Sequence, residues 1–117
     1  MLKIAFHHFS FIVMENKIIE YGMNRIHVPP KHFGYDKRMK GWDKGYTPRL
    51  HSELDAYRRA KGLIMNHEFE MINIRLCNDG KMLKISCPCN VCQEWLPSVG
   101  CKKLAFSVDT GFAYMTF

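Results

Sequence analysis

The distribution of apolar and polar residues predicts a β-hairpin at each end of the chain. Residues 3–14 are rich in Ile, Phe and Val, residues 15–17 supply turn-forming side chains, and residues 18–26 resume the apolar pattern. Residues 103–108 and 112–117 repeat this arrangement around a short turn that contains a glycine. Branched and aromatic residues on both sides of a tight turn are typical of antiparallel strand pairs.

Two segments between these hairpins carry helix signals. Residues 51–61 hold strong helix formers with acidic side chains early and basic side chains late, and Gly62 follows them. This order suits the helix dipole and predicts a helix that ends at the glycine. Pro88 suits a first helical turn, so we predict a second, short helix over residues 89–96 that ends before Pro97.

A further strand is predicted between the two helices. Residues 70–76 alternate and are rich in β-forming side chains, and residues 78–80 form a turn that leads through residues 81–86 to Pro88. The element order is then β-β-α-β-α-β-β, which predicts an α/β fold: a mixed five-stranded sheet with helices on its faces. A chain of 117 residues, with 47% hydrophobic residues, suits a single domain over residues 1–117.

The segment from residue 27 to residue 49 shows no sustained period and holds prolines, glycines and several aromatic residues. Long aromatic loops in compact domains are usually functional, so we expect this one to cover a substrate. The chain carries a formal charge of +6, and this loop is its most basic part. We expect the charge to attract a small phosphate-bearing ligand, with nucleic acid as the less favoured partner. The basic residues concerned are Lys37, Arg38, Lys40, Lys44 and Arg49.

The cysteine pattern points to metal binding. The sequence has no apolar run long enough to span a bilayer and no signal peptide, so we expect a cytoplasmic protein without a membrane partner. Thiols stay reduced in that compartment, and three of the five cysteines lie within residues 87–92. Closely spaced reduced cysteines indicate ligands in preference to disulfides, whereas Cys77 and Cys101 are expected to be ordinary buried residues.

Two short motifs supply a complete ligand set. His51-Ser52-Glu53 opens the first predicted helix, and Pro88-Cys89-Asn90-Val91-Cys92 opens the second. The imidazole of His51 and the thiolates of Cys89 and Cys92 suit Zn²⁺ and leave its fourth position for water. The helix N-terminus favours the thiolate form of both cysteines. Glu53 lies close to the metal without being needed as a ligand.

This pair of motifs resembles the signature of the zinc-dependent cytidine and deoxycytidylate deaminase superfamily. The resemblance implies an enzyme that hydrolyses a cytosine nucleoside or nucleotide, deoxycytidylate-like in our first interpretation, to the uracil product and ammonia. Glu53 would take a proton from the attacking water and pass protons to the ring nitrogen and the departing amine.

The resemblance extends to two substrate-binding positions. Residues 18–24 are similar to the second strand of the family, which ends in Gly-x-Asn, and this implies that Asn24 contacts the substrate. Ser86 resembles the start of the family's Ser-x-Pro-Cys segment, whose main chain contacts the base. Arg75 together with Ser86 is similar to a subset of small viral and plant-type proteins, and a viral origin would place the protein in the host cytoplasm.

The sequence also departs from the family. Family members usually have a helix before the first strand, and this chain is expected to lack it, so we expect another subunit to cover one face of the sheet in a homo-oligomer. His51 as the first ligand resembles the deoxycytidylate, tRNA and polynucleotide branches. The final hairpin resembles the free-nucleoside branch, so the branch stays open.

Three alternatives remain at this point. The first is a deaminase that acts on cytosine or adenine in single-stranded DNA or RNA. The second is a non-catalytic zinc-binding module of the same fold. The third is a structural zinc site with a fourth cysteine ligand, drawn from Cys77, Cys87 and Cys101. Asn24, outside the family context, is an ordinary turn residue after a strand.

Overall fold

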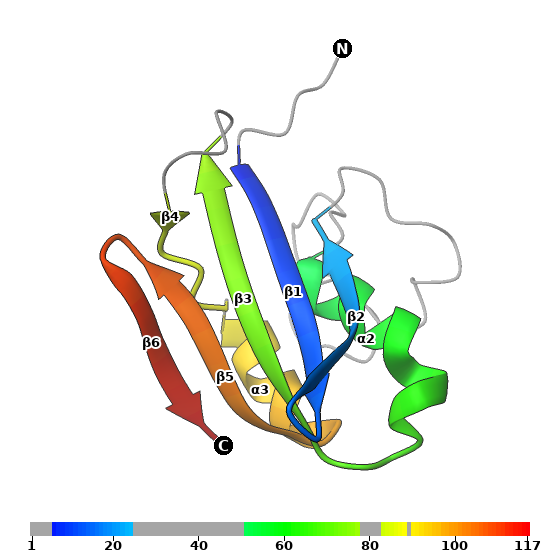
Figure 1. The fold of residues 1–117 in the computed structure, drawn as a ribbon. Helices are drawn as coiled ribbons and strands as arrows, with labels where there is room; N and C mark the ends of the chain where they lie inside the picture. Colours follow the sequence, from blue (N-terminus) through cyan, green and yellow to red (C-terminus); the bar gives the residue numbers. More distant parts are fainter. Residues whose placement is uncertain (1–5, 25–50, 78–82, 89) are drawn as a thin grey trace.

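The computed structural model describes residues 6–24, 51–77, 83–88 and 90–117 (Figure 1). The expected loop over residues 27–49, with its basic and aromatic side chains, lies outside the described residues. In chain order the described elements are β1 (Phe6–Met14), β2 (Lys17–Met23), α2 (Ser52–Ile64), β3 (Phe69–Cys77), β4 (Leu83–Lys84), α3 (Asn90–Ser98), β5 (Cys101–Val108) and β6 (Gly111–Thr116).

The strands form one mixed sheet. Its order is β2-β1-β3-β5-β6, and the short β4 pairs with β3 beside this path. β3 and β5 run parallel, whereas the other strand pairs are antiparallel. The α/β class, the mixed sheet and the two helices are as the sequence predicts, and the pairing of the two-residue β4 is an addition to the predicted order.

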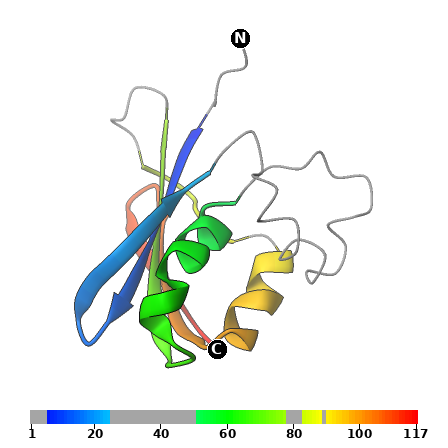
Figure 2. The same cartoon turned by 90° about the vertical axis from the view of Figure 1, so that its right-hand side faces the viewer.

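Both described helices pack on the same face of the sheet (Figure 2). The core contains Leu54 and Ala60 from α2, Leu96 from α3, and Met71 and Leu104 from the central strands, all almost fully buried. The rings of Tyr57 and Trp95 meet edge-on at 5.1 Å and join the two helices. The expectation that helices lie on the faces of the sheet therefore holds for one face only, within the part of the chain that the structure describes.

The helices end later than the sequence predicts. α2 continues through Gly62 to Ile64, which is 1% exposed, because one more turn brings this apolar side chain into the core. The turn closes at Met65, whose left-handed backbone lets its N–H bond to the carbonyl of Lys61. α3 includes Pro97 in its last turn, where few backbone bonds remain to be lost. No helix in the described ranges is long and apolar enough to cross a membrane.

α2 lies unusually close to the edge strand β2. A Cβ atom on Gly22 would lie 2.2 Å from the backbone nitrogen of Ala56, which is far inside van der Waals contact. The N–H of Met23 donates to the carboxylate of Asp55 at 3.0 Å and ties the end of the strand to the same turn of the helix. Packing therefore requires a glycine at position 22, because only a residue without a side chain lets α2 approach β2 this closely.

We predict opposite effects for two glycine-to-alanine substitutions. Gly22→Ala forces α2 away from β2 and should lower the free energy of unfolding by about 1–3 kcal/mol or more. Gly62→Ala is the matched control, because a Cβ there meets nothing within 4 Å and the residue lies inside a helix. It should raise stability by about 0.5–1 kcal/mol. Urea unfolding of both variants checks this, and equal effects would contradict the close approach.

Candidate functional site

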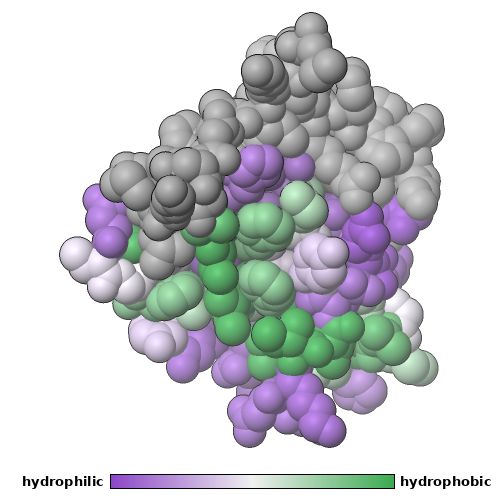
Figure 3. Space-filling model, turned by 45° about the horizontal axis from the view of Figure 1, so that its top comes forward, coloured by the Kyte–Doolittle hydropathy of each residue, from purple (hydrophilic) through white to green (hydrophobic). Residues whose placement is uncertain are grey.

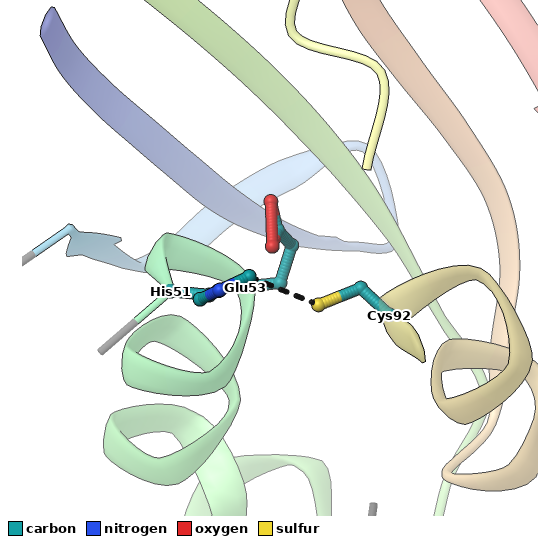
Figure 4. A group of neighbouring side chains, drawn as sticks. All are labelled: His51, Glu53 and Cys92. Carbon is teal, nitrogen blue, oxygen red and sulfur yellow. Dashed lines mark hydrogen bonds between the residues drawn. The ribbon is translucent and has the colours of Figure 1, made fainter. Parts of the chain in front are cut away.

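Three side chains with metal-binding atoms meet where α2 and α3 begin (Figure 4). His51 immediately precedes α2, Glu53 lies in its first turn, and Cys92 lies near the start of α3. One ligand atom from each lies within 4.8 Å of the others. The topology explains this meeting: each helix precedes one of the parallel strands β3 and β5, so both helices begin at the carboxyl end of these strands.

The three candidate metal-ligand atoms are a nitrogen, a sulfur and an oxygen, and the side chains that carry them are mostly buried. The Nδ1 atom of His51 lies 3.6 Å from the Sγ atom of Cys92. Cys92 is fully buried, Glu53 is 4% exposed, and His51 is half-buried. The imidazole makes no capping hydrogen bond with α2, and the extended backbone of His51 directs it toward α3 instead. These three residues could therefore hold a metal ion.

The other cysteines whose side chains the structure describes do not add to this group, and Cys77 is not one of them. Cys89, the third predicted ligand, lies outside the described residues. Cys87 is exposed and accepts a hydrogen bond from the side chain of Gln93. Cys101 is buried in the core, and burial raises the pKa of its thiol to about 12. Neither Cys87 nor Cys101 contributes to the group of ligand atoms, which disfavours both as a fourth ligand.

Glu53 is anchored by a buried amide that sequence analysis did not identify. The Nδ2 atom of Asn73 donates to the Oε1 atom of Glu53 at 3.0 Å, and the hydroxyl of Ser52 donates to the same oxygen at 3.4 Å. Asn73 is 2% exposed and lies in the middle of β3. Both contacts hold the carboxylate through Oε1 and so fix its orientation beside His51 and Cys92.

The orientation of the Asn73 amide follows from its partners. Its Oδ1 atom accepts a hydrogen bond from the hydroxyl of Ser10 at 2.7 Å, and Ser10 also contacts the hydroxyl of Ser52 at 2.7 Å. Because the amide oxygen is engaged by Ser10, the amide nitrogen faces Glu53 and the carbonyl of Ser86. The signal for Asn73 was present in the sequence: it lies at the same period-two positions as Phe69 and Met71, on the face that should be apolar.

Ser86 lies behind this network and joins two strands. Its hydroxyl donates to the carbonyl of Asn73 at 2.9 Å and accepts from the N–H of Ser107 at 2.7 Å. Its own N–H bonds to the carbonyl of Ser107. These contacts hold the segment before α3 between β3 and β5, and the substrate contact of Ser86 stays a prediction.

Asn24 closes the end of the β1–β2 pair. Its side-chain oxygen accepts a hydrogen bond from the N–H of His8 at 2.9 Å, and its own N–H donates to the carbonyl of His8 at 3.2 Å. It follows directly after Met23, which bonds to Asp55 in the first turns of α2. Asn24 therefore lies near the start of α2, and its contact with a substrate stays a prediction.

His8 and Arg75 lie next to each other on β1 and β3, on the same face as Ser10 and Asn73. Burial, with smaller contributions from the charges of Arg75 and His51, lowers the pKa of His8 to about 4. The guanidinium of Arg75 donates to the carbonyl of Ile85 at 3.3 Å. A neutral imidazole and a permanent cation thus lie beside the His51 end of the site.

The lowered pKa of His8 predicts a pH-dependent stability. The unfolded chain binds a proton to His8 near its ordinary pKa of 6.5, whereas the folded chain binds it only near about 4. The stabilising contribution is complete above pH 6.5 and is lost as the pH falls toward about 4. Urea unfolding across this range should show a steeper loss for the wild type than for His8→Asn. An NMR titration in which His8 protonates at 6.5 would contradict the prediction.

A comparison with models of protein families finds no matching family, and a comparison with curated proteins finds no similar sequence. The assignment of a function to this site therefore depends on its own residues and geometry.

Proposed function

We propose that this protein is a zinc-dependent hydrolytic deaminase that converts cytosine to uracil in a free nucleoside or nucleotide. One observation carries the proposal: His51, Glu53 and Cys92 meet at the starts of two helices, with their ligand atoms within 4.8 Å of one another. A metal-binding imidazole and thiol beside a buried carboxylate are the groups that metal-assisted hydrolysis requires.

The spacing of the donors suits zinc. A tetrahedral zinc ion with an imidazole nitrogen at about 2.0–2.1 Å and a thiolate at about 2.3 Å holds these two atoms about 3.6 Å apart. The observed separation of Nδ1 in His51 and Sγ in Cys92 is 3.6 Å. We assign Cys89 as the third ligand, as the sequence motif implies. The metal, when bound, acts as a Lewis acid that makes water a nucleophile at neutral pH.

We assign proton transfer to Glu53. Its carboxylate lies beside the proposed ligands, and the hydrogen bonds from Asn73 and Ser52 hold it through Oε1. A carboxylate fixed in this way can remove a proton from the attacking water and deliver protons to the ring nitrogen and the leaving amine. Asn73 acts as a positioning residue, since it contacts Glu53 and not the reacting atoms.

The charge around the site favours a nucleotide over a nucleoside as the substrate. Burial lowers the pKa of His8, and Arg75 and His51 both lie close enough to lower it further. Burial keeps His8 neutral at physiological pH, so Arg75 supplies the permanent positive charge at this end of the site. A 5′-phosphate would find a complementary charge there, which supports a deoxycytidylate-like substrate.

The two alternative functions make different demands. Deamination of single-stranded DNA or RNA requires binding to oligonucleotides that weakens steeply with salt. A non-catalytic zinc module requires a metal with four protein ligands and no exchangeable position. The hydrogen bond from Asn73 favours the catalytic alternative, because it holds the Oε1 atom of the buried Glu53 as a base beside the proposed ligands.

Metal content should depend on Cys92 and not on Cys87. Cys92→Ala removes a proposed ligand and should reduce bound zinc from one ion per chain to a small fraction of that amount. Cys87→Ala is the matched control, because this neighbouring thiol is exposed and outside the ligand group. Elemental analysis of purified proteins measures both. Loss of zinc from the Cys87 variant would instead support a four-ligand structural site.

Glu53→Gln should strongly reduce turnover while leaving the metal in place. The amide is nearly isosteric but cannot accept the proton, so we expect kcat to fall by about 10²–10⁴-fold or more. Ammonia release from cytosine and adenine nucleosides, nucleotides and oligonucleotides is the measurement. Turnover confined to free nucleosides or mononucleotides supports the proposal, and turnover of oligonucleotides alone contradicts it. Zinc-loaded protein without turnover on any substrate would also contradict it.

Two further variants make this experiment specific. Glu94→Gln changes an exposed acid on α3 and should leave kcat unchanged. Asn73→Ala should lower kcat with little change in KM or zinc content. When it is combined with Glu53→Gln, Asn73→Ala should not lower the residual turnover further, because Asn73 acts through Glu53. An additional loss in the double variant would show that Asn73 has only a general structural role.

A further inference from the structure

The face of the sheet opposite the helices is largely apolar, and no described element packs on it. α2 and α3 lie on one face, and in Figures 1 and 2 the described chain leaves the other face open. Residues that are paired across neighbouring strands point to the same face of a sheet, so the strand register identifies the residues of this open face. Its apolar members are Phe9, Phe11, Val13, Ile18, Tyr21, Met23, Ile72, Ile74, Leu76, Ala105, Phe112 and Tyr114.

The central strand β3 shows the unusual character of this face. The helix-covered side of β3 includes the polar residues Asn73 and Arg75, which surround the candidate site. Its open side presents Ile72, Ile74 and Leu76. A sheet that faces water on one side normally places its polar residues there. Here the open-face positions after Glu70 are apolar, whereas Asn73 and Arg75 lie on the covered side, which indicates that the open face is covered in the functional protein.

The exposure of the open face supports this view. The central positions Phe11 and Ile72 are half-buried among their neighbours, whereas Tyr21 is 51% exposed and Tyr114 is 65% exposed at the two edges. In Figure 3 hydrophobic side chains form a continuous band across the visible part of this face. Contiguous apolar surfaces of this kind mark sites of protein association.

The charges on this face limit the kind of partner. Among the described strand positions, the charged residues of the open face are Glu70 and Lys103, which are paired across β3 and β5, and the face also carries His7 opposite Leu76. The face thus has no net charge at these positions, although the whole chain carries +6. This composition is unsuited to a polyanion. It is self-complementary, because a two-fold axis between the two residues exchanges one charge with the other.

We propose that the open face binds a second copy of this chain in a symmetric, face-to-face dimer. The apolar residues of the two sheets pack together, and Glu70 of each protomer lies opposite the partner's Lys103. This interface is separate from the candidate site, so it stands whether or not the protein is a deaminase.

Sedimentation velocity on the wild-type protein tests the proposal first. We expect a reversible species of twice the 13.7 kDa monomer mass at micromolar to millimolar concentration. Ile72→Lys places a charge in the middle of the interface and should weaken association by at least about 100-fold. Leu63→Lys is the matched control, because Leu63 is 59% exposed on α2 and lies away from the open face. It should leave association unchanged.

A charge exchange tests the symmetry without depending on the folding of the Ile72 variant. Glu70→Lys and Lys103→Glu should each weaken self-association by about tenfold or more, because like charges then meet across the axis. Mixing the two variants should restore a heterodimer, since each mutated residue then faces an opposite charge. A wild-type protein that stays monomeric throughout, or variants that do not recover on mixing, would overturn the proposal.

Discussion

The structure depends on the burial of one carboxylate. Glu53 is 4% exposed, and an ionised group in such a setting costs several kcal/mol unless hydrogen bonds offset the lost hydration. Asn73 and Ser52 donate to it, and Ser10 fixes the amide that does so. These residues come from β1, α2 and β3, so the requirement of one side chain determines how three elements pack. The helix that carries Glu53, α2, is also the one that lies close to β2 at Gly22.

This polar interior has a consequence for the rest of the sheet. β3 uses inward positions for Asn73 and Arg75, and these positions contribute less apolar surface to the core than branched residues would. The outward positions Ile72 and Ile74 hold the apolar surface of the strand instead. The inward positions of β3 therefore serve the candidate site, and its outward positions serve the proposed dimer interface. The association of two chains would bury the apolar surface that the helices leave exposed.

Local signals in the sequence were sufficient to predict much of this fold. The two hairpins and the start of α2 follow from turn residues, periodicity and helix polarity, and Glu15 and Asn16 form the first turn with the positive φ angles that such hairpins use. The meeting of His51 and Cys92, two candidate metal ligands, agrees with the spacing of the two sequence motifs. Features that depend on tertiary contacts were not predictable in this way.

Gly62, for example, is a common helix terminator, but burial of Ile64 extends α2 beyond it. The side chains that hold Glu53 are separated by up to 63 residues along the chain, so only the fold brings them together.

Zinc K-edge X-ray absorption on the purified protein tests the proposed zinc site. We expect two sulfur ligands at about 2.3 Å, from Cys89 and Cys92, and two nitrogen or oxygen ligands at about 2.0–2.1 Å, from His51 and an exchangeable water. A shell of three or four sulfur atoms would contradict this expectation and identify the site as a structural one.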